Sequence, residues 1–251
     1  MHIVSLHPID FETVRRYVAA LNGATIDPSG LEAPPGNLSE DTARARNGDE
    51  RAAIRLTYGL ALALGQATPV FTCQDAFGLS FWEAQVDRPL GMLMRPPARL
   101  FMDAGLDAAA ARAMPTRLDL QLGMMGGAYI PDRLAEQAHQ LLDDHMERSV
   151  KRLMAAEYDP MASLGLMYEA VSYAREHGFG LYEAMDVTGP DGEGLPGSTV
   201  LRPDRKRLDR DLVQRIAGYQ KPPKPPGLIQ RMFGRSGSPA SVNGHLPEGD
   251  S

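Results

Sequence analysis

The segment 131–177 constrains the fold most strongly, because its apolar residues recur at the spacing of two long amphipathic helices. Pro131 suits the first turn of a helix that we expect to run to about residue 157, a length of about 40 Å. Tyr158-Asp159-Pro160 breaks that helix and caps the next one, which Gly178 ends. A short link between two amphipathic helices predicts an antiparallel hairpin, and we expect this hairpin to form the spine of the protein.

Shorter elements are predicted from caps, glycines and prolines on either side of this hairpin. The alternation of polar and apolar residues over 117–122 is typical of a half-buried strand. Together these signals predict a mainly α protein of the α+β class, with a small accessory sheet. Further helices are expected over 10–22, 49–64, 96–102, 107–114 and 203–219, and strands near 69–73, 80–86 and 117–122.

The C-terminal part differs in composition from the rest. We expect a single globular domain over 1–201 and a basic helix over 202–219. Over 220–251 the sequence predicts a flexible tail. This tail begins with a Lys-Pro-Pro-Lys-Pro-Pro run, typical of extended polyproline II, and ends in Gly, Ser and Pro with few apolar groups.

Cysteine use and hydropathy narrow the class of protein. The 251-residue chain has one cysteine, Cys73, so it cannot form an internal disulfide and is no disulfide scaffold. It opens without a basic and apolar leader, and no apolar run approaches the roughly 18 residues that cross a bilayer. We therefore expect a cytoplasmic protein without a membrane span.

Charge is distributed unevenly along the chain. The net charge is −6, but residues 202–235 carry +7 and residues 1–201 carry −11. A basic arm on an acidic body can dock on that body, or it can reach an outside anion such as a nucleic acid or an acidic protein. The candidate partner-binding residues in this arm and in the tail are Arg205, Lys206, Arg207, Arg210, Arg231 and Phe233.

Gly123, Gly126 and Gly127 form a candidate anion-binding loop. They lie between the strand predicted over 117–122 and the long helix, and such a loop presents backbone N–H groups and a helix N-terminus to a phosphate. Neither a G-x-G-x-x-G nor a P-loop sequence is present, however. The alternative is a turn that needs a positive φ.

Glu136, His139 and Asp143 are the candidate metal ligands. They share one face of the long helix, and a histidine with carboxylates at this spacing can hold a divalent ion. The alternative is a solvated face, because metal sites in bundles project inward from several helices. His145 lies in the apolar face and is predicted to be a hydrogen-bonded core histidine. Cys73 is predicted to be a buried thiol.

The absence of a catalytic signature favours a binding function. We expect a non-enzymatic cytosolic protein, of an adaptor or toxin-neutralising kind, whose acidic body binds a basic protein partner without a cofactor. One alternative is an enzyme that acts on a phosphorylated or anionic small molecule at residues 123–131. The other is nucleic-acid binding through residues 202–235.

Overall fold

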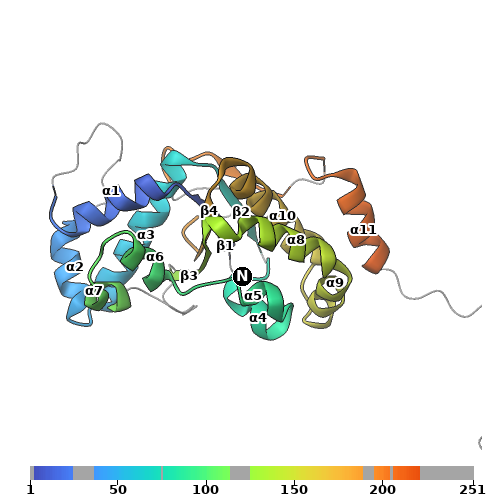
Figure 1. Cartoon of the computed structure of the whole chain (residues 1–251), viewed down its shortest axis with the longest axis horizontal. Coiled ribbons are helices and arrows are strands. Elements are labelled where there is room, and N and C mark those ends of the chain that lie inside the picture. The colour runs from blue at the N-terminus through green and yellow to red at the C-terminus, as the bar shows by residue number, and fades with distance from the viewer. Residues whose placement is uncertain are drawn as a thin grey trace, which may run out of the picture. The chain divides into compact units, whose positions relative to one another are not determined.

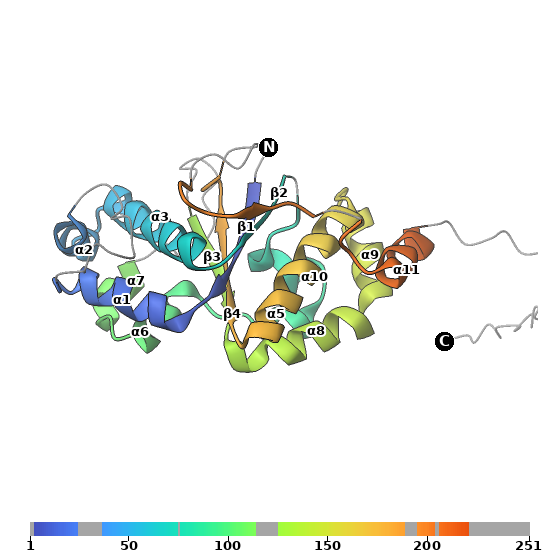
Figure 2. The same cartoon turned by 90° about the horizontal axis from the view of Figure 1, so that it is seen from above.

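A five-stranded mixed sheet forms the centre of the protein, in the order β3-β4-β1-β2-β5 (Figure 2). The structure is a computed structural model, and it describes residues 3–24, 37–74, 76–113, 125–188, 195–203 and 206–220. All of these belong to the first of two units, residues 1–220, and residues 221–251 form the second.

β1 and β4 lie at the middle of the sheet and are buried along their whole length. β1 pairs antiparallel with β2 and β4, β3 pairs antiparallel with β4, and β5 runs parallel to β2. A strand that is buried at every position must be covered on both faces. The strands are β1 (Ile3–Ile9), β2 (Val70–Gln74), β3 (Met125–Ile130), β4 (Gly180–Met185) and β5 (Val200–Leu201).

Helices cover both faces of the sheet, and each layer has its own apolar core (Figures 1 and 2). One layer contains α1 (Phe11–Leu21), α2 (Leu38–Arg46), α3 (Glu50–Ala67), α6 (Pro97–Asp103) and α7 (Ala108–Ala113). The other contains α4 (Trp82–Gln85), α5 (Arg88–Gly91), α8 (Ala135–Asp144), α9 (Met146–Ala155), α10 (Pro160–His177) and α11 (Arg210–Gln220), with the 3-10 turns η1 (Leu79–Phe81) and η2 (Asp132–Leu134).

The predicted class, mainly helical with a small sheet, is confirmed, and local signals placed several helix ends correctly. The Asp10 carboxylate accepts hydrogen bonds from the backbone N–H groups of Glu12 and Thr13 and so begins α1. Asp159 caps α10 through the N–H of Met161, and Gly178 ends α10 with a φ of +69°.

The predicted single helix over 131–157 is wrong, because the chain leaves helical geometry at His145 and divides into η2, α8 and α9. At this break the His145 Nδ1 atom lies 2.8 Å from a carboxylate oxygen of Asp87, which is buried. This hydrogen bond joins residues 58 positions apart, so the helical periodicity of the sequence cannot reveal it. α8 packs against α10, but the central sheet, and not a hairpin, lies at the middle of the fold.

The strand predicted over 80–86 is also wrong, because this segment forms η1 and α4. Its two aromatic residues do not indicate a strand: Trp82 is fully buried in the core, whereas Phe81 is exposed. The helix expected over 49–64 continues to Ala67 as α3 and therefore contains Gly65. A Cβ there would lie 2.5 Å from the Ser198 hydroxyl, so this glycine serves close packing inside α3.

Two further predictions concern the helix expected from residue 203 and the strand expected over 117–122. The helix expected from residue 203 begins at Arg210. The strand expected over 117–122 lies outside the described residues, whereas β1, which the sequence patterns did not reveal, is central. No helix in the part of the chain that the structure describes is long and apolar enough to cross a membrane.

Candidate functional site

The predicted glycine loop is a strand where the structure describes it. Gly126 and Gly127 lie in β3, which begins at Met125, and Gly123 lies outside the described residues. The strand–loop–helix geometry expected around residues 126 and 127 is therefore wrong. Anion binding by these three glycines remains a sequence prediction.

The three candidate metal ligands do not converge. Glu136 is exposed and lies 3.8 Å from Arg175, whereas Asp143 accepts hydrogen bonds from the Tyr168 hydroxyl at 2.8 Å and from Arg215 at 2.9 Å. His139 approaches Asp143 only to 3.5 Å. Within the described ranges, no group of three or more His, Cys, Asp or Glu side chains is placed to hold a metal ion.

The described part of the basic segment docks on the body of the protein. Arg215 pairs with Asp143, and Arg207 lies 3.4 Å from a carboxylate oxygen of Glu169 on α10. Burial and the Asp143 carboxylate raise the pKa of the Tyr168 hydroxyl above its ordinary value. The apolar side chains of this segment, Leu208, Leu212 and Ile216, are buried in the core. Lys206 and Arg210 are exposed, and Arg205, Arg231 and Phe233 lie outside the described residues.

His145 and Cys73 have the environments of structural groups. His145 is hydrogen-bonded to the buried Asp87, as expected for a core histidine, although part of its side chain is exposed. Cys73 is half-buried at the end of β2, not fully buried as predicted.

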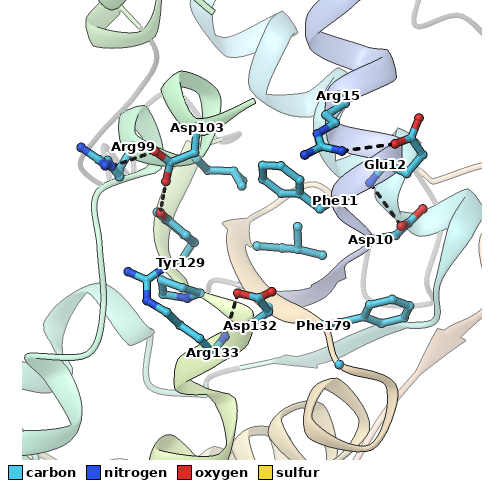
Figure 3. Close-up of a pocket in the computed structure, with 15 residues that line it drawn as sticks. Asp10, Phe11, Glu12, Arg15, Arg99, Asp103, Tyr129, Asp132, Arg133 and Phe179 are labelled. Carbon is cyan, nitrogen blue, oxygen red and sulfur yellow. Dashed lines mark hydrogen bonds and ion pairs between the residues drawn. The ribbon is translucent and has the colours of Figure 1, made fainter. Parts of the chain in front are cut away.

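A cleft of about 620 Å³ opens where β1 and β3 end and β4 begins (Figure 3). Its volume is in the range of sites that enclose a small ligand or a short peptide segment. Figure 3 shows Arg99, Asp103, Tyr129 and Arg133 on one side, Asp10, Phe11, Glu12, Arg15 and Phe179 on the other, and Asp132 between them. Ile9, Leu100, Pro131, Gly178 and Gly180 complete the lining.

Chain turns at the end of the sheet create this cleft. β1 leads through Asp10 into α1, so the first turn of α1 forms one wall. β3 leads through Pro131 into η2, which forms the opposite wall. Gly180 lets β4 begin close to both, because a Cβ at this position would lie 2.6 Å from the carbonyl oxygen of Ile130. The cleft is therefore a product of the topology and not of one local motif.

One side of the cleft is a hydrogen-bonded group of three side chains. Arg99 Nε lies 3.0 Å from one carboxylate oxygen of Asp103, and the Tyr129 hydroxyl donates to the other at 3.3 Å. Burial and the Asp103 carboxylate raise the pKa of Tyr129 to about 12, although the nearby Arg99 and Arg133 act in the opposite sense. Tyr129 is thus a protonated hydrogen-bond donor at neutral pH.

The other side combines aromatic rings with an exposed ion pair. The Arg15 guanidinium lies 4.9 Å from the centre of the Phe11 ring and 3.8 Å from Glu12. Arg15 and Glu12 are largely exposed, so this pair contributes little to stability and is free to exchange partners. Phe11 and Phe179 provide apolar surface beside these charges, as the two rings in Figure 3 show.

Asp132 and Arg133 differ from the other charged residues of the cleft. The Asp132 carboxylate accepts a hydrogen bond from the backbone N–H of Arg133 at 2.7 Å, and both side chains are exposed. Neither side chain forms an ion pair with any residue that the structure describes. Asp132 and Arg133 are therefore an anion and a cation that no ion pair within the described residues already engages.

The chemistry of the cleft is suited to binding. Its described lining contains no Ser, Thr, Cys, His or Lys, and its ionisable side chains are four carboxylates, three guanidinium groups and the Tyr129 phenol. Asp10 is engaged in capping, and Asp103 is engaged by Arg99 and Tyr129. Arginines, carboxylates, a phenol and two phenyl rings are the groups that recognise polar polypeptide segments.

The alternative site predicted at residues 123–131 contains two of the lining residues, Tyr129 and Pro131, and the sequence indicates no site at the others. Residue 10 is predicted only as the start of a helix. The lining residues extend from Ile9 to Gly180 along the chain, and strand pairing together with the packing of α6 on β3 brings them together. No protein-family model, no curated protein and no solved structure matches this chain, so the geometry is the only evidence for a site.

Proposed function

We propose that this is a non-enzymatic protein-binding protein, of an adaptor or toxin-neutralising kind, that receives a segment of a basic partner in the cleft at the end of the sheet. The observation that carries the proposal is the lining itself, which pairs exposed charges with two phenyl rings and contains no Ser, Thr, Cys, His or Lys among the described residues. A cytoplasmic location belongs to the same proposal, and it has no other support than the sequence.

The charge balance supports a basic partner. The cleft contains four carboxylates and three guanidinium groups, and the chain as a whole carries a net charge of −6. Complementary charge steers a partner toward such a surface and fixes its orientation. Phe11 and Phe179 then supply apolar contact area, which provides affinity once water is displaced from the cleft.

Affinity capture from the native cell, followed by identification of bound proteins, tests this proposal when a cleft variant is run in parallel. We expect the full chain to retain a basic protein and Asp132→Lys to lose it. Glu176→Lys is the matched control, because Glu176 is exposed at the end of α10 and is not among the residues that line the cleft. Capture that is equal for the wild type and Asp132→Lys would refute a role for the cleft.

A second candidate, binding or conversion of an anionic small molecule, is favoured by one observation. Tyr129 and Pro131, which belong to the segment 123–131, line the cleft beside Arg99 and Arg133. Turnover in a metabolite screen that Arg133→Gln abolishes, together with no captured protein, would favour this candidate over the first.

A further inference from the structure

Two oppositely charged side chains of the cleft have no ion-pair or side-chain hydrogen-bond partner among the described residues, and they are consecutive in the sequence. Within the described residues, Glu12 has Arg15 and Asp103 has Arg99. Asp10 is held by backbone N–H groups of α1 and by the hydroxyl of Thr13 at 2.6 Å. Only Asp132 and Arg133, on η2, have no charged or side-chain partner among the described lining residues.

We infer that the cleft selects a polypeptide segment in which a carboxylate and a cation lie next to each other, the carboxylate meeting Arg133 and the cation meeting Asp132. This inference rests on the proposed function, since it names the chemistry of the partner segment at the same site. It goes beyond a basic partner because it requires a second, acidic group on the same segment.

The position of Arg133 supports the carboxylate half of this inference. In Figure 3 the Arg133 side chain extends along the wall of the cleft toward Tyr129. A guanidinium can bind a carboxylate through two parallel N–H bonds, and no carboxylate of the described residues occupies this one. An acidic side chain of a ligand could therefore bind the Arg133 guanidinium beside the protonated Tyr129 hydroxyl.

The position of Asp132 supports the cationic half. Its carboxylate points into the cleft between the Tyr129 side and the Phe179 side (Figure 3). The phenyl ring of Phe179 on that side can accept the aliphatic stem of a lysine or arginine, while the charged end reaches Asp132. Because Asp132 and Arg133 are consecutive and line the same cleft, neighbouring residues of one ligand segment can supply both counter-charges, about one or two residues apart.

Like-charge repulsion makes this arrangement selective. A segment with only basic side chains would bring a cation to Asp132 but would also place positive charge beside Arg133. A segment with only acidic side chains would bring a carboxylate to Arg133 but would also place negative charge beside Asp132. Each misplaced charge costs affinity, so a segment with both charges is preferred to either kind alone.

Blocked dipeptides test this inference directly. The probes are N-acetyl, C-amide forms of Lys-Glu, Glu-Lys, Lys-Gln and Gln-Glu, titrated into the full chain while backbone amide shifts of η2 and of the first turn of α1 are recorded. We expect one of the two mixed-charge peptides to bind about threefold to tenfold more tightly than Lys-Gln and Gln-Glu. Arg133→Gln should reduce this peptide to the affinity of Lys-Gln, and Asp132→Asn should reduce it to that of Gln-Glu.

Matched controls are available on the neighbouring helices. Glu136 and Arg175 form an exposed pair at 3.8 Å and are not among the lining residues, so Glu136→Gln and Arg175→Gln should leave the order of the peptides unchanged. Equal affinities for the mixed and singly charged peptides would overturn the inference, as would the absence of saturable shifts with every peptide. An order of peptides that neither cleft variant changes would overturn it too.

The outcomes separate this inference from the function on which it rests. Free lysine and free glutamate each carry both charges. If either binds more tightly than the blocked dipeptides, the preference for a ligand with both charges is supported and the proposal of a protein partner is refuted. If the peptides show no preference but Asp132→Lys still abolishes capture of a basic protein, then the proposed function is supported and the mixed-charge selectivity is refuted.

Discussion

The histidine at the centre of the sheet predicts a loss of stability in mild acid. His7 lies on β1 and is fully buried, with its Nε2 atom 3.0 Å from the hydroxyl oxygen of Ser5. Its Nδ1 atom has no hydrogen-bond partner in the described part of the chain. Burial lowers the pKa of His7 from 6.5 to about 3, because a charged imidazolium would lose its hydration inside the protein.

The sign of the effect follows from these two pKa values. Below pH 6.5 the unfolded chain binds a proton at His7 that the folded protein does not accept until about pH 3. The stability from neutral His7 is therefore fully present above pH 6.5 and is lost as the pH falls toward 3. The loss approaches about 1.4 kcal/mol per pH unit, which gives about 2 kcal/mol between pH 6.5 and 4.5.

Urea unfolding at a series of pH values measures this contribution. Trp82 is the only tryptophan and is fully buried, so its fluorescence reports the transition. His7→Gln keeps a polar side chain that does not titrate, and carboxylates common to both proteins cancel in the comparison. We expect the stability of the wild type relative to His7→Gln to fall by about 2 kcal/mol from pH 6.5 to 4.5.

Two results would refute this reasoning. One is a pair of stability curves for the wild type and His7→Gln that stay parallel across this pH range. The other does not depend on the variant folding: a proton NMR titration in which the His7 ring changes protonation near pH 6.5 in the native protein would show that burial does not shift its pKa.

Three smaller changes test the backbone geometry, each by urea or thermal unfolding. Glu157 adopts a φ of +62° just after α9, so Glu157→Gly should stabilise the protein by about 0.5 to 1 kcal/mol, and a destabilisation would show that the glutamate side chain has a structural role. Gly180→Ala should cost about 1 to 3 kcal/mol, because its Cβ would lie 2.6 Å from the Ile130 carbonyl oxygen; a neutral change would mean that the strands can separate freely. Asp10→Ala should cost about 0.5 to 2 kcal/mol through loss of the α1 cap, and Asp10→Asn, which can still cap, should restore most of it.

Local chemistry could be read from the sequence where one residue decides the outcome. Asp10, Asp159 and Gly178 act on their own backbone neighbours, so the helix ends that they define were predictable. The break at His145 was not predictable, because its partner Asp87 is distant in the sequence and helical periodicity does not reveal a contact of this kind. Tertiary contacts override local preference at such positions.

The candidate site was less predictable than the fold class, because tertiary contacts and not local sequence bring its residues together. Tyr129 was read as part of a loop after a strand, but its neighbours in the cleft, Asp103 and Phe11, come from helices on different parts of the chain. The sequence-predicted clusters, such as Glu136 with Asp143, share a helix face but have different partners in space. Spacing along a helix identifies a shared face, and it cannot identify what covers that face.

The central position of β1 has a consequence for how the protein is made. β1 is translated before both of its neighbours, and it must wait longest for β4, because Ile9 pairs with Gly180 and Val4 with Met185. Contacts between such distant residues slow folding, and an emerging chain would hold one edge of its innermost strand unpaired until most of the sequence has been translated. Premature termination before residue 180 would leave that edge permanently open to other chains, so fragments of this kind should aggregate rather than persist as smaller folded domains.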